Sequence, residues 1–236
     1  MRRIVRGLVL LGAATVAFGS GAADIKPAPA FSKQQLTALP KDGWITNGGN
    51  VFNQRYSPLT EINKDTVKNL KAEWRIHLNS GIGPQYSGQA QPLAYDGVLY
   101  YVTGANDTFA IDVETGKTLW TYQANLDPAR VKVCCGWVAR GVGLGEGKIF
   151  VGQLDAKLVA LDQKTGKVVW SIQGEDPLQG YSIASAPLYY DGMVITGYAG
   201  GDMGVRGRVK AYSAKNGKLL WTFYTIPAPG EFGSET

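Results

Sequence analysis

Short strands are the main element that the hydrophobic pattern predicts. Three segments mix apolar and aromatic residues in alternation with polar ones: DGVLYYVTG at 96–104, EGKIFVGQL at 146–154 and DGMVITGYA at 191–199. This alternation is typical of strands with one buried face, and the Asp-Gly and Gly-Lys dipeptides that break it are hairpin signals. The pattern therefore predicts an all-β chain built from hairpins.

A repeat of about 50 residues organises these strands. The segments AIDVETGKTLWTY (110–122), ALDQKTGKVVWSI (160–172) and AYSAKNGKLLWTF (211–223) share one frame, and their tryptophans Trp120, Trp170 and Trp221 lie 50 and 51 residues apart. In the D-x-x-T-G-K core the Asp accepts backbone N–H bonds and the Gly takes a positive φ. Four-stranded units at this period, each ending in a tryptophan, predict β-propeller blades. We expect each tryptophan to dock between neighbouring sheets, because one blade alone cannot bury both of its faces.

The repeat is incomplete. Trp74 precedes Trp120 by 46 residues and is predicted to end a partial first blade, and residues 62–70 before it predict a short helix with Asn63 as N-cap. Three full repeats and a partial one do not close a ring. We therefore expect the chain to be the N-terminal part of a longer propeller, and assembly of four blade-like units in another way is the alternative.

The first 23 residues have the pattern of a secretory signal peptide. MRRIVR is basic, residues 7–19 are apolar and uncharged, and small residues follow. The apolar run is shorter than the roughly 20 residues that span a bilayer, although an uncleaved anchor is the alternative. We predict cleavage near Ala22 or Ala23, a propeller domain at 24–236 and a periplasmic location, with membrane association left open.

Charge and histidine content exclude several classes of function. The net charge is +5, but the signal peptide holds three of the 24 basic residues, which leaves 21 basic against 19 acidic ones. A balance this even argues against nucleic acid as a partner. His77 is the single histidine, so a multi-histidine metal site is excluded, and no Ser/His/Asp triad is recognised in the sequence.

Cys134 and Cys135, the two cysteines of the chain, are adjacent. Neighbouring Cα atoms lie about 3.8 Å apart, which is below the usual disulfide range of roughly 4.4–6.8 Å. A bond between them would close a strained eight-membered ring, and two buried thiols are the alternative. Export to an oxidising compartment favours the bond.

These features together resemble a known family. Cys134-Cys135 with Arg140-Gly141 behind it, the tryptophan repeats, GGDMGVRG at 200–207 and WITNGGNVFNQRYSPLTEIN at 44–63 are similar to pyrroloquinoline quinone (PQQ)-dependent alcohol dehydrogenases. The resemblance implies an eight-bladed propeller with the quinone near its axis, and oxidation of an alcohol by hydride transfer to that quinone. It also implies that the two cysteines form a vicinal disulfide lying flat against one face of the cofactor.

The same resemblance assigns roles to individual residues. Arg140 would contact the quinone, whose carboxylates a planar guanidinium can engage bidentately. Asp202 stands where the family usually has a glutamate that ligates Ca²⁺ or a lanthanide, the Lewis acid of the reaction. Gly200 and Gly201 would let the backbone approach the quinone closely.

Three other positions depart from the family pattern. Gln89 replaces a glutamate, Ala199 a serine and Gly152 a threonine, all of which contact the cofactor in the family. With Asp202, these four altered positions indicate a divergent substrate, weaker quinone binding or loss of the cofactor.

No catalytic residue is predicted within the chain. The family's aspartate base, its assisting arginine and the tryptophan that covers the other quinone face would lie beyond Thr236. Expected partners are a small alcohol and an electron acceptor such as a cytochrome c or a quinone. The alternative function is a non-catalytic periplasmic propeller that scaffolds protein assembly, which would have little use for the CC-x4-R pattern.

Overall fold

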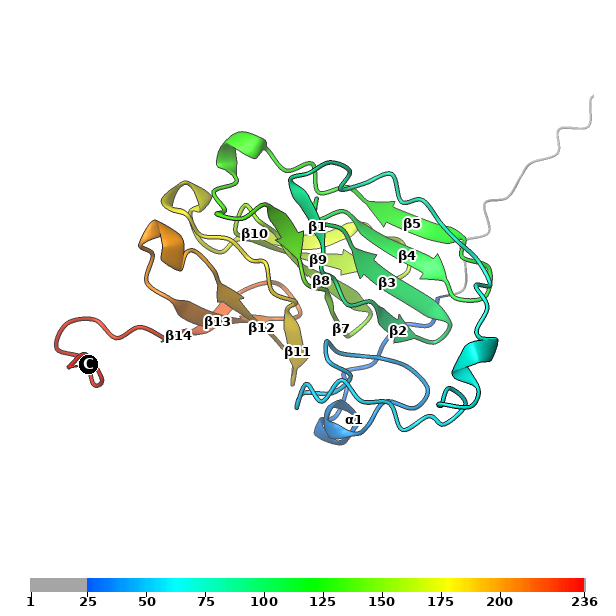
Figure 1. Cartoon of the computed structure of the whole chain (residues 1–236). Coiled ribbons are helices and arrows are strands. Elements are labelled where there is room, and N and C mark those ends of the chain that lie inside the picture. The colour runs from blue at the N-terminus through cyan, green and yellow to red at the C-terminus, as the bar shows by residue number, and fades with distance from the viewer. Residues whose placement is uncertain (1–24, 236) are drawn as a thin grey trace, which may run out of the picture.

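Three four-stranded antiparallel sheets form most of the computed structural model, which describes residues 25–235 (Figure 1). Within each sheet the strands lie side by side in the order of the sequence, so each is a meander, as in a propeller blade. The predicted all-β propeller architecture is confirmed. Blade 1 contains β2 Leu93–Tyr95, β3 Val98–Val102, β4 Thr108–Asp112 and β5 Thr118–Tyr122. Blade 2 contains β7 Gly143–Gly145, β8 Lys148–Gly152, β9 Lys157–Asp162 and β10 Val168–Gln173. Blade 3 contains β11 Leu188–Tyr190, β12 Met193–Tyr198, β13 Arg208–Ser213 and β14 Leu219–Tyr224.

Two-residue turns set the register of the first hairpin in each blade. Both central residues have positive φ in all three turns: Asp96-Gly97 (47° and 76°), Glu146-Gly147 (50° and 65°) and Asp191-Gly192 (48° and 71°). Positive φ at both positions is the signature of the type I′ turn, whose twist matches that of the flanking strands.

The predicted Asp-x-x-Thr-Gly turns join the third and fourth strands of blades 1 and 2. The Asp112 carboxylate accepts from the backbone N of Thr115 at 2.7 Å and from its hydroxyl at 2.6 Å. Asp162 repeats this with Thr165, at 2.9 and 2.7 Å. The turn glycines of the three blades have positive φ: Gly116 (69°), Gly166 (68°) and Gly217 (72°).

The repeated tryptophans join each unit to the next. The indole N–H of Trp120 donates to the Gln163 carbonyl at 2.9 Å, and that of Trp170 donates to the Ala214 carbonyl at 3.1 Å. Each ring also covers the turn glycine of the following repeat. A Cβ on Gly166 would lie 2.6 Å from the Trp120 ring, and a Cβ on Gly217 would lie 2.9 Å from the Trp170 ring. Docking of the tryptophans between sheets is therefore confirmed. Trp221, the last of the series, is 40% exposed.

The segment before blade 1 is less regular than predicted. The expected helix at 62–70 is a single 3₁₀ turn, η1 Val67–Asn69, because the Asn63 side chain accepts from the backbone N of Asp65 and Thr66 and so caps an earlier turn. Trp74 lies outside any strand, so the partial blade was wrong as a sheet. Its indole still donates to the Val113 carbonyl at 2.8 Å, as the repeat requires.

A short helix near the start of the described residues was not predicted. Helix α1, Lys33–Thr37, begins with a capping box in which Ser32 and Gln35 each bond the other's backbone N–H. The Ser-x-x-Gln spacing is the signal that could have identified it.

The predicted signal peptide and its cleavage site lie outside residues 25–235. Among the residues that the structure describes, no helix has the length and apolarity needed to cross a membrane.

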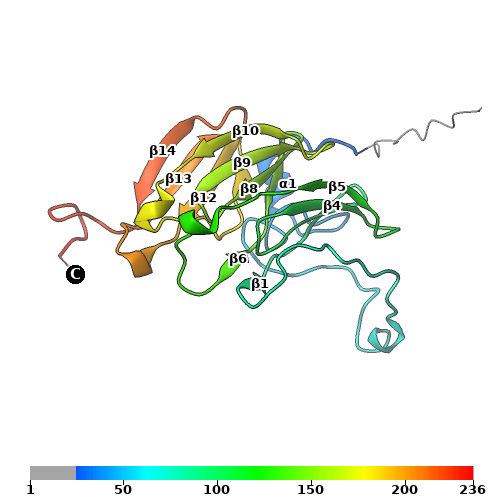
Figure 2. The ribbon, with the colours of Figure 1, turned by 90° about the horizontal axis from the view of Figure 1, so that it is seen from above.

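A small parallel sheet and the first strands of the blades lie together on the side that carries the site. Strand β1, Tyr86–Gly88, pairs in parallel with β6, Trp137–Ala139, and the two lie side by side in Figure 2.

The first strands of blades 2 and 3, β7 and β11, are in contact. The core between these blades includes the stacked rings of Phe150 and Tyr189, whose centroids are 6.2 Å apart. Three further 3₁₀ turns, η2 Pro128–Arg130, η3 Pro177–Gln179 and η4 Gly201–Met203, lie in the connecting loops.

Candidate quinone site

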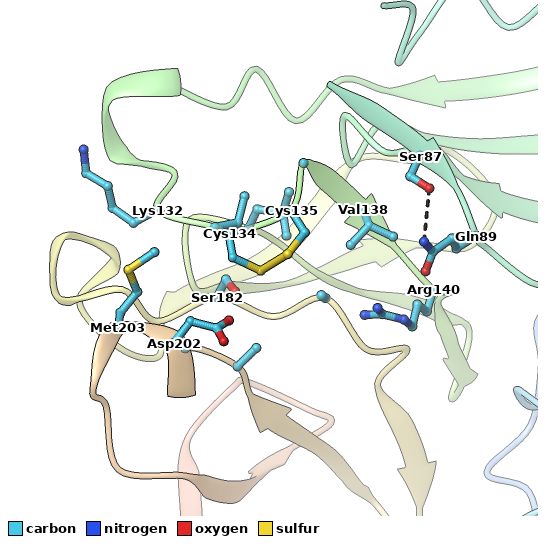
Figure 3. Close-up of a pocket in the computed structure, with 16 residues that line it drawn as sticks. Ser87, Gln89, Lys132, Cys134, Cys135, Val138, Arg140, Ser182, Asp202 and Met203 are labelled. Atoms are coloured by element: carbon cyan, nitrogen blue, oxygen red, sulfur yellow. Dashed lines mark hydrogen bonds between the residues drawn. A yellow bond between two sulfur atoms is a disulfide. The ribbon is translucent and has the colours of Figure 1, made fainter. Parts of the chain in front are cut away.

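A cavity of about 260 Å³ lies between the small parallel sheet, the loop that leads into β6 and the loop between the second and third strands of blade 3 (Figure 3). Seven of the nine residues predicted from the sequence line it: Gln89, Cys134, Cys135, Arg140, Ala199, Gly200 and Asp202. Gly152 and Gly201 do not line it. The structure therefore brings together residues that are up to 113 positions apart in the sequence.

Four residues of the cavity lie on the β1–β6 pair or directly after it. Ser87 is opposite Val138 in the parallel register, which places Gln89 and Arg140 one step beyond the paired residues. The Gln89 side-chain amide donates to the Ser87 hydroxyl at 3.1 Å. The Arg140 backbone is held on both sides, since its N donates to the Ala184 carbonyl at 3.0 Å and its carbonyl accepts from the Gln91 N. Within residues 25–235 the Arg140 guanidinium has no hydrogen-bond or ion-pair partner, and Figure 3 shows it pointing into the cavity.

Cys134 and Cys135 are joined to each other by a disulfide, with Cα atoms 3.8 Å apart. Of the two alternatives from the sequence, the structure has the bond rather than two thiols. Both residues are exposed, and the S–S bond borders the cavity (Figure 3). The loop ends at Gly136, whose φ is +94°, and the next backbone N, that of Trp137, donates to the Gln85 carbonyl at 2.6 Å.

Asp202 lies on η4, in a loop that departs from the repeat. In blades 1 and 2 five residues separate the last residues that pair between the second and third strands, 103–107 and 153–157. In blade 3 the corresponding loop has nine residues, 199–207. The Asp202 side chain makes no hydrogen bond or ion pair with the rest of the described chain, and in Figure 3 its carboxylate points into the cavity from the side opposite Arg140.

The structure shows the surroundings of three further predicted residues, Gly152, Gly201 and Ala199. A Cβ on Gly152 would lie 2.3 Å from Ile183 Cγ2, so Gly152 faces the interface of blades 2 and 3 and not the cavity. A Cβ on Gly201 would meet nothing within 4 Å in the described part of the protein, so its predicted role toward the quinone stays a prediction. Ala199 pairs through both backbone groups with Ser182, at 2.8 and 3.1 Å, which leaves only its methyl group for the cavity.

Ser182 is a cavity residue that the sequence did not indicate. It is 3% exposed, and its hydroxyl has no partner in the described part of the chain. Figure 3 shows this hydroxyl between the disulfide and Asp202. Because Ser182 pairs with Ala199, its hydroxyl lies next to the position at which the family serine was expected and can supply the missing donor. Ser87 is a second such hydroxyl.

A charged cluster lies behind the Ser182–Ala199 pair. The Glu175 carboxylate contacts Arg208 at 2.8 Å and Lys210 at 2.6 Å, and all three side chains are mostly buried. Arg208 also donates to the Tyr181 hydroxyl. Burial raises the pKa of neighbouring Tyr198, so that phenol stays neutral. Two cations against one carboxylate leave a positive excess behind the cavity wall, which favours an anionic ligand.

The donor set of the cavity fits a flat ligand that carries several carboxylates. One guanidinium, two serine hydroxyls and one amide can donate to carboxylate oxygens, and the disulfide offers a nonpolar surface without hydrogen-bond donors. A hard cation requires six to eight oxygen ligands. No three His, Cys, Asp or Glu side chains gather within residues 25–235. Asp202 can therefore be one ligand of such an ion, with the other ligands supplied by groups outside this set.

Comparison with known proteins decides the family. Residues 44–236 match the family described as PQQ, glucose/ethanol/alcohol dehydrogenase, beta-propeller domain. The chain belongs to this family. It is 45% identical over 199 residues to the quinoprotein alcohol dehydrogenase PedH of Pseudomonas putida, a match that covers 84% of this chain and 33% of that protein. The chain thus spans about a quarter to a third of the length of the curated relatives that it matches.

Solved quinoprotein structures have the same fold as this chain. The quinohemoprotein alcohol dehydrogenase ADHIIG of Pseudomonas putida HK5 superposes with a TM-score of 0.78 at 34% identity, covering 86% of this chain and 30% of that one. A europium-containing methanol dehydrogenase superposes with a TM-score of 0.73 at 32% identity, covering 78% and 32%. The resemblance to PQQ-dependent alcohol dehydrogenases that the sequence suggested is confirmed.

Proposed function

We propose that this chain forms the quinone-binding part of a periplasmic PQQ-dependent dehydrogenase that oxidises an alcohol. The observation that carries the proposal is the convergence of the vicinal disulfide, Arg140 and Asp202 on one cavity, from two connections that lie far apart in the sequence. Membership of the quinoprotein dehydrogenase family supports it. A scaffold that only assembles other proteins would have no need for this set of side chains around a cavity.

The residues of the cavity have distinct tasks in this proposal. When bound, PQQ supplies the hydride acceptor, and a Ca²⁺ or lanthanide ion supplies Lewis acidity. The disulfide between Cys134 and Cys135 provides a rigid wall against which a planar ring can lie. Arg140 pairs with a carboxylate of the ligand, and its planar guanidinium orients that carboxylate. Gln89 and the hydroxyls of Ser87 and Ser182 donate further hydrogen bonds.

Asp202 holds the cation through its carboxylate. The aspartate side chain is one methylene shorter than the glutamate usual in the family, so the ion would have to lie closer to the η4 backbone. Oxygen ligands suit both Ca²⁺ and lanthanide ions, and the side chains of this chain do not select between them.

Location and electron transfer complete the proposal. The basic and apolar N-terminal pattern supports export to the periplasm. There the oxidising environment preserves the disulfide. A cytochrome c or a quinone would accept the electrons from the reduced cofactor, and the alcohol would be a small molecule.

Substitution of Asp202 in the full-length protein tests the proposal. Asp202→Asn keeps the shape of the side chain but removes a charge, so Ca²⁺ and PQQ should each bind at least about tenfold more weakly. Asp191→Asn, in the β11–β12 turn away from the cavity, is the matched control and should bind like the wild type. The measurements are metal content by mass spectrometry and equilibrium binding of PQQ. Wild-type protein that binds neither PQQ nor Ca²⁺ would contradict the proposed function and favour the scaffold.

A further inference from the structure

The η4 turn that carries Asp202 rests on another turn, which ends η3 at Gly180. Gly180 has a φ of +96°, and a Cβ built on it would lie 2.3 Å from Cβ and 2.6 Å from Cγ of Met203. In the other direction, a Cβ on Gly200 would lie 2.3 Å from the Gly180 carbonyl oxygen. The two turns therefore touch through glycines on both sides, with no room for a methyl group between them.

The two residues of the η4 turn that contact Gly180 flank Asp202 in the sequence. Gly200 precedes Asp202 by two residues and Met203 follows it directly, and both rest on Gly180. Within the turn, the Met203 N donates to the Gly200 carbonyl at 2.8 Å. The Asp202 side chain itself has no partner among residues 25–235. The position of the Asp202 carboxylate therefore depends on the backbone of η4. The position of η4 depends in turn on its packing against Gly180.

We propose that Gly180 is a positioning residue that sets where the Asp202 carboxylate enters the cavity. The inference rests on the proposed function, because it treats Asp202 as the group that holds the cation. A methyl group at position 180 must move η4 by more than about 1 Å to restore ordinary carbon–carbon contacts of roughly 3.5–4.0 Å. An aspartate has little spare reach to compensate for such a shift.

The test is the affinity of the full-length protein for PQQ and for Ca²⁺ alone, measured by isothermal titration calorimetry. Gly180→Ala should weaken both by about tenfold to a hundredfold, the range found when groups that orient metal ligands are disturbed. Gly97→Ala is the matched control. Gly97 also has a positive φ, +76°, but a Cβ there would meet nothing within 4 Å, so the variant carries a similar backbone strain without the contact. Its affinities should stay within about twofold of the wild type.

A second substitution separates positioning from general loss of structure. In Gly180→Ala/Met203→Gly the atoms that the new methyl would meet at 2.3 and 2.6 Å are gone, and the nearest remaining atom of residue 203 is its Cα at 3.9 Å. The double variant should recover at least about tenfold of the lost affinity. If Gly180→Ala alone does not fold, the double variant should fold and should bind both PQQ and Ca²⁺.

The outcomes distinguish the two proposals. If the wild type binds PQQ and Ca²⁺ and Gly180→Ala binds them equally well, Gly180 does not position Asp202, while the proposed function stands. If Gly180→Ala is weak or unfolded and Met203→Gly does not rescue it, the effect does not pass through this contact and the inference is wrong. If the wild type binds neither ligand, the proposed function itself fails.

Discussion

Replacing Trp120 with Phe should lower the free energy of unfolding by about 3 kcal/mol. The indole N–H of Trp120 donates to the Gln163 carbonyl at 2.9 Å, and the side chain is only 8% exposed. Loss of this bond leaves a buried carbonyl without its indole partner, which costs about 1–2 kcal/mol. The smaller ring adds roughly 1–2 kcal/mol from lost apolar burial and the cavity left behind.

Trp221→Phe provides the matched control within the same repeat. Trp221 has the equivalent place in blade 3, but it is 40% exposed and its indole has no hydrogen-bond partner in the part of the chain that the structure describes. The same substitution should therefore change the unfolding free energy by less than about 0.5 kcal/mol, as is usual for surface positions. The difference between the two variants measures the contribution of docking between blades.

The assay is urea unfolding of residues 24–236, followed by far-UV circular dichroism so that loss of a tryptophan does not alter the signal. The m-values of the variants must agree with the wild type before midpoints are converted to free energies. Equal losses for Trp120→Phe and Trp221→Phe would refute the reasoning, as would a loss below about 1 kcal/mol for Trp120→Phe. Either result would mean that the indole bond to the next blade does not stabilise the stack.

Three further predictions concern the site and the turns. The intact mass of the exported protein should rise by two hydrogens on reduction, with no thiol titrating beforehand; two reactive thiols in the native protein would contradict the bond between Cys134 and Cys135. Arg140→Lys should weaken PQQ binding by about tenfold in equilibrium dialysis, because the charge remains but the planar fork is lost; unchanged affinity would remove Arg140 from the site. Hydrogen bonds from Thr115 lower the pKa of Asp112 below its ordinary value of 3.8, so its stabilising effect is present above that pH and is lost as the pH falls toward the lowered pKa. Asp112→Asn should therefore reduce the acid dependence of urea unfolding below about pH 4, and an unchanged dependence would argue against this role.

The blades could be predicted because their signals are local. An acidic residue followed by glycine makes the type I′ turn of the first hairpin, and Asp-x-x-Thr-Gly makes the turn between the third and fourth strands. Both signals are independent of distant residues. The tryptophan at a fixed distance after that turn then identifies the repeat. Each of these features is encoded within about ten residues, so the order of strands in each sheet follows from the sequence.

Elements that depend on distant partners were missed. Strands β1 and β6 have three residues each and pair in parallel across 51 positions, so no periodicity marks them. Ser182 lies in the cavity because its backbone pairs with Ala199, which is a tertiary contact. The family resemblance placed Gly152 at the site, and only the structure shows that a Cβ there would also lie 2.3 Å from Ile183 Cγ2. Similarity to a family can name positions, but packing decides what each one does.

The cavity is built where the chain departs from its own repeat. The loop between the second and third strands is short in blades 1 and 2, whereas the corresponding nine-residue loop of blade 3 carries Asp202. The connection between blades 1 and 2 carries the disulfide and Arg140, neither of which has an equivalent in the other repeats. The regular strands support these inserted loops. Contacts between the loops, such as that of Gly180 with Met203, then fix the position of one loop relative to the next. Substitutions in the repeat should therefore change stability first, and substitutions in the inserted loops should change ligand affinity first.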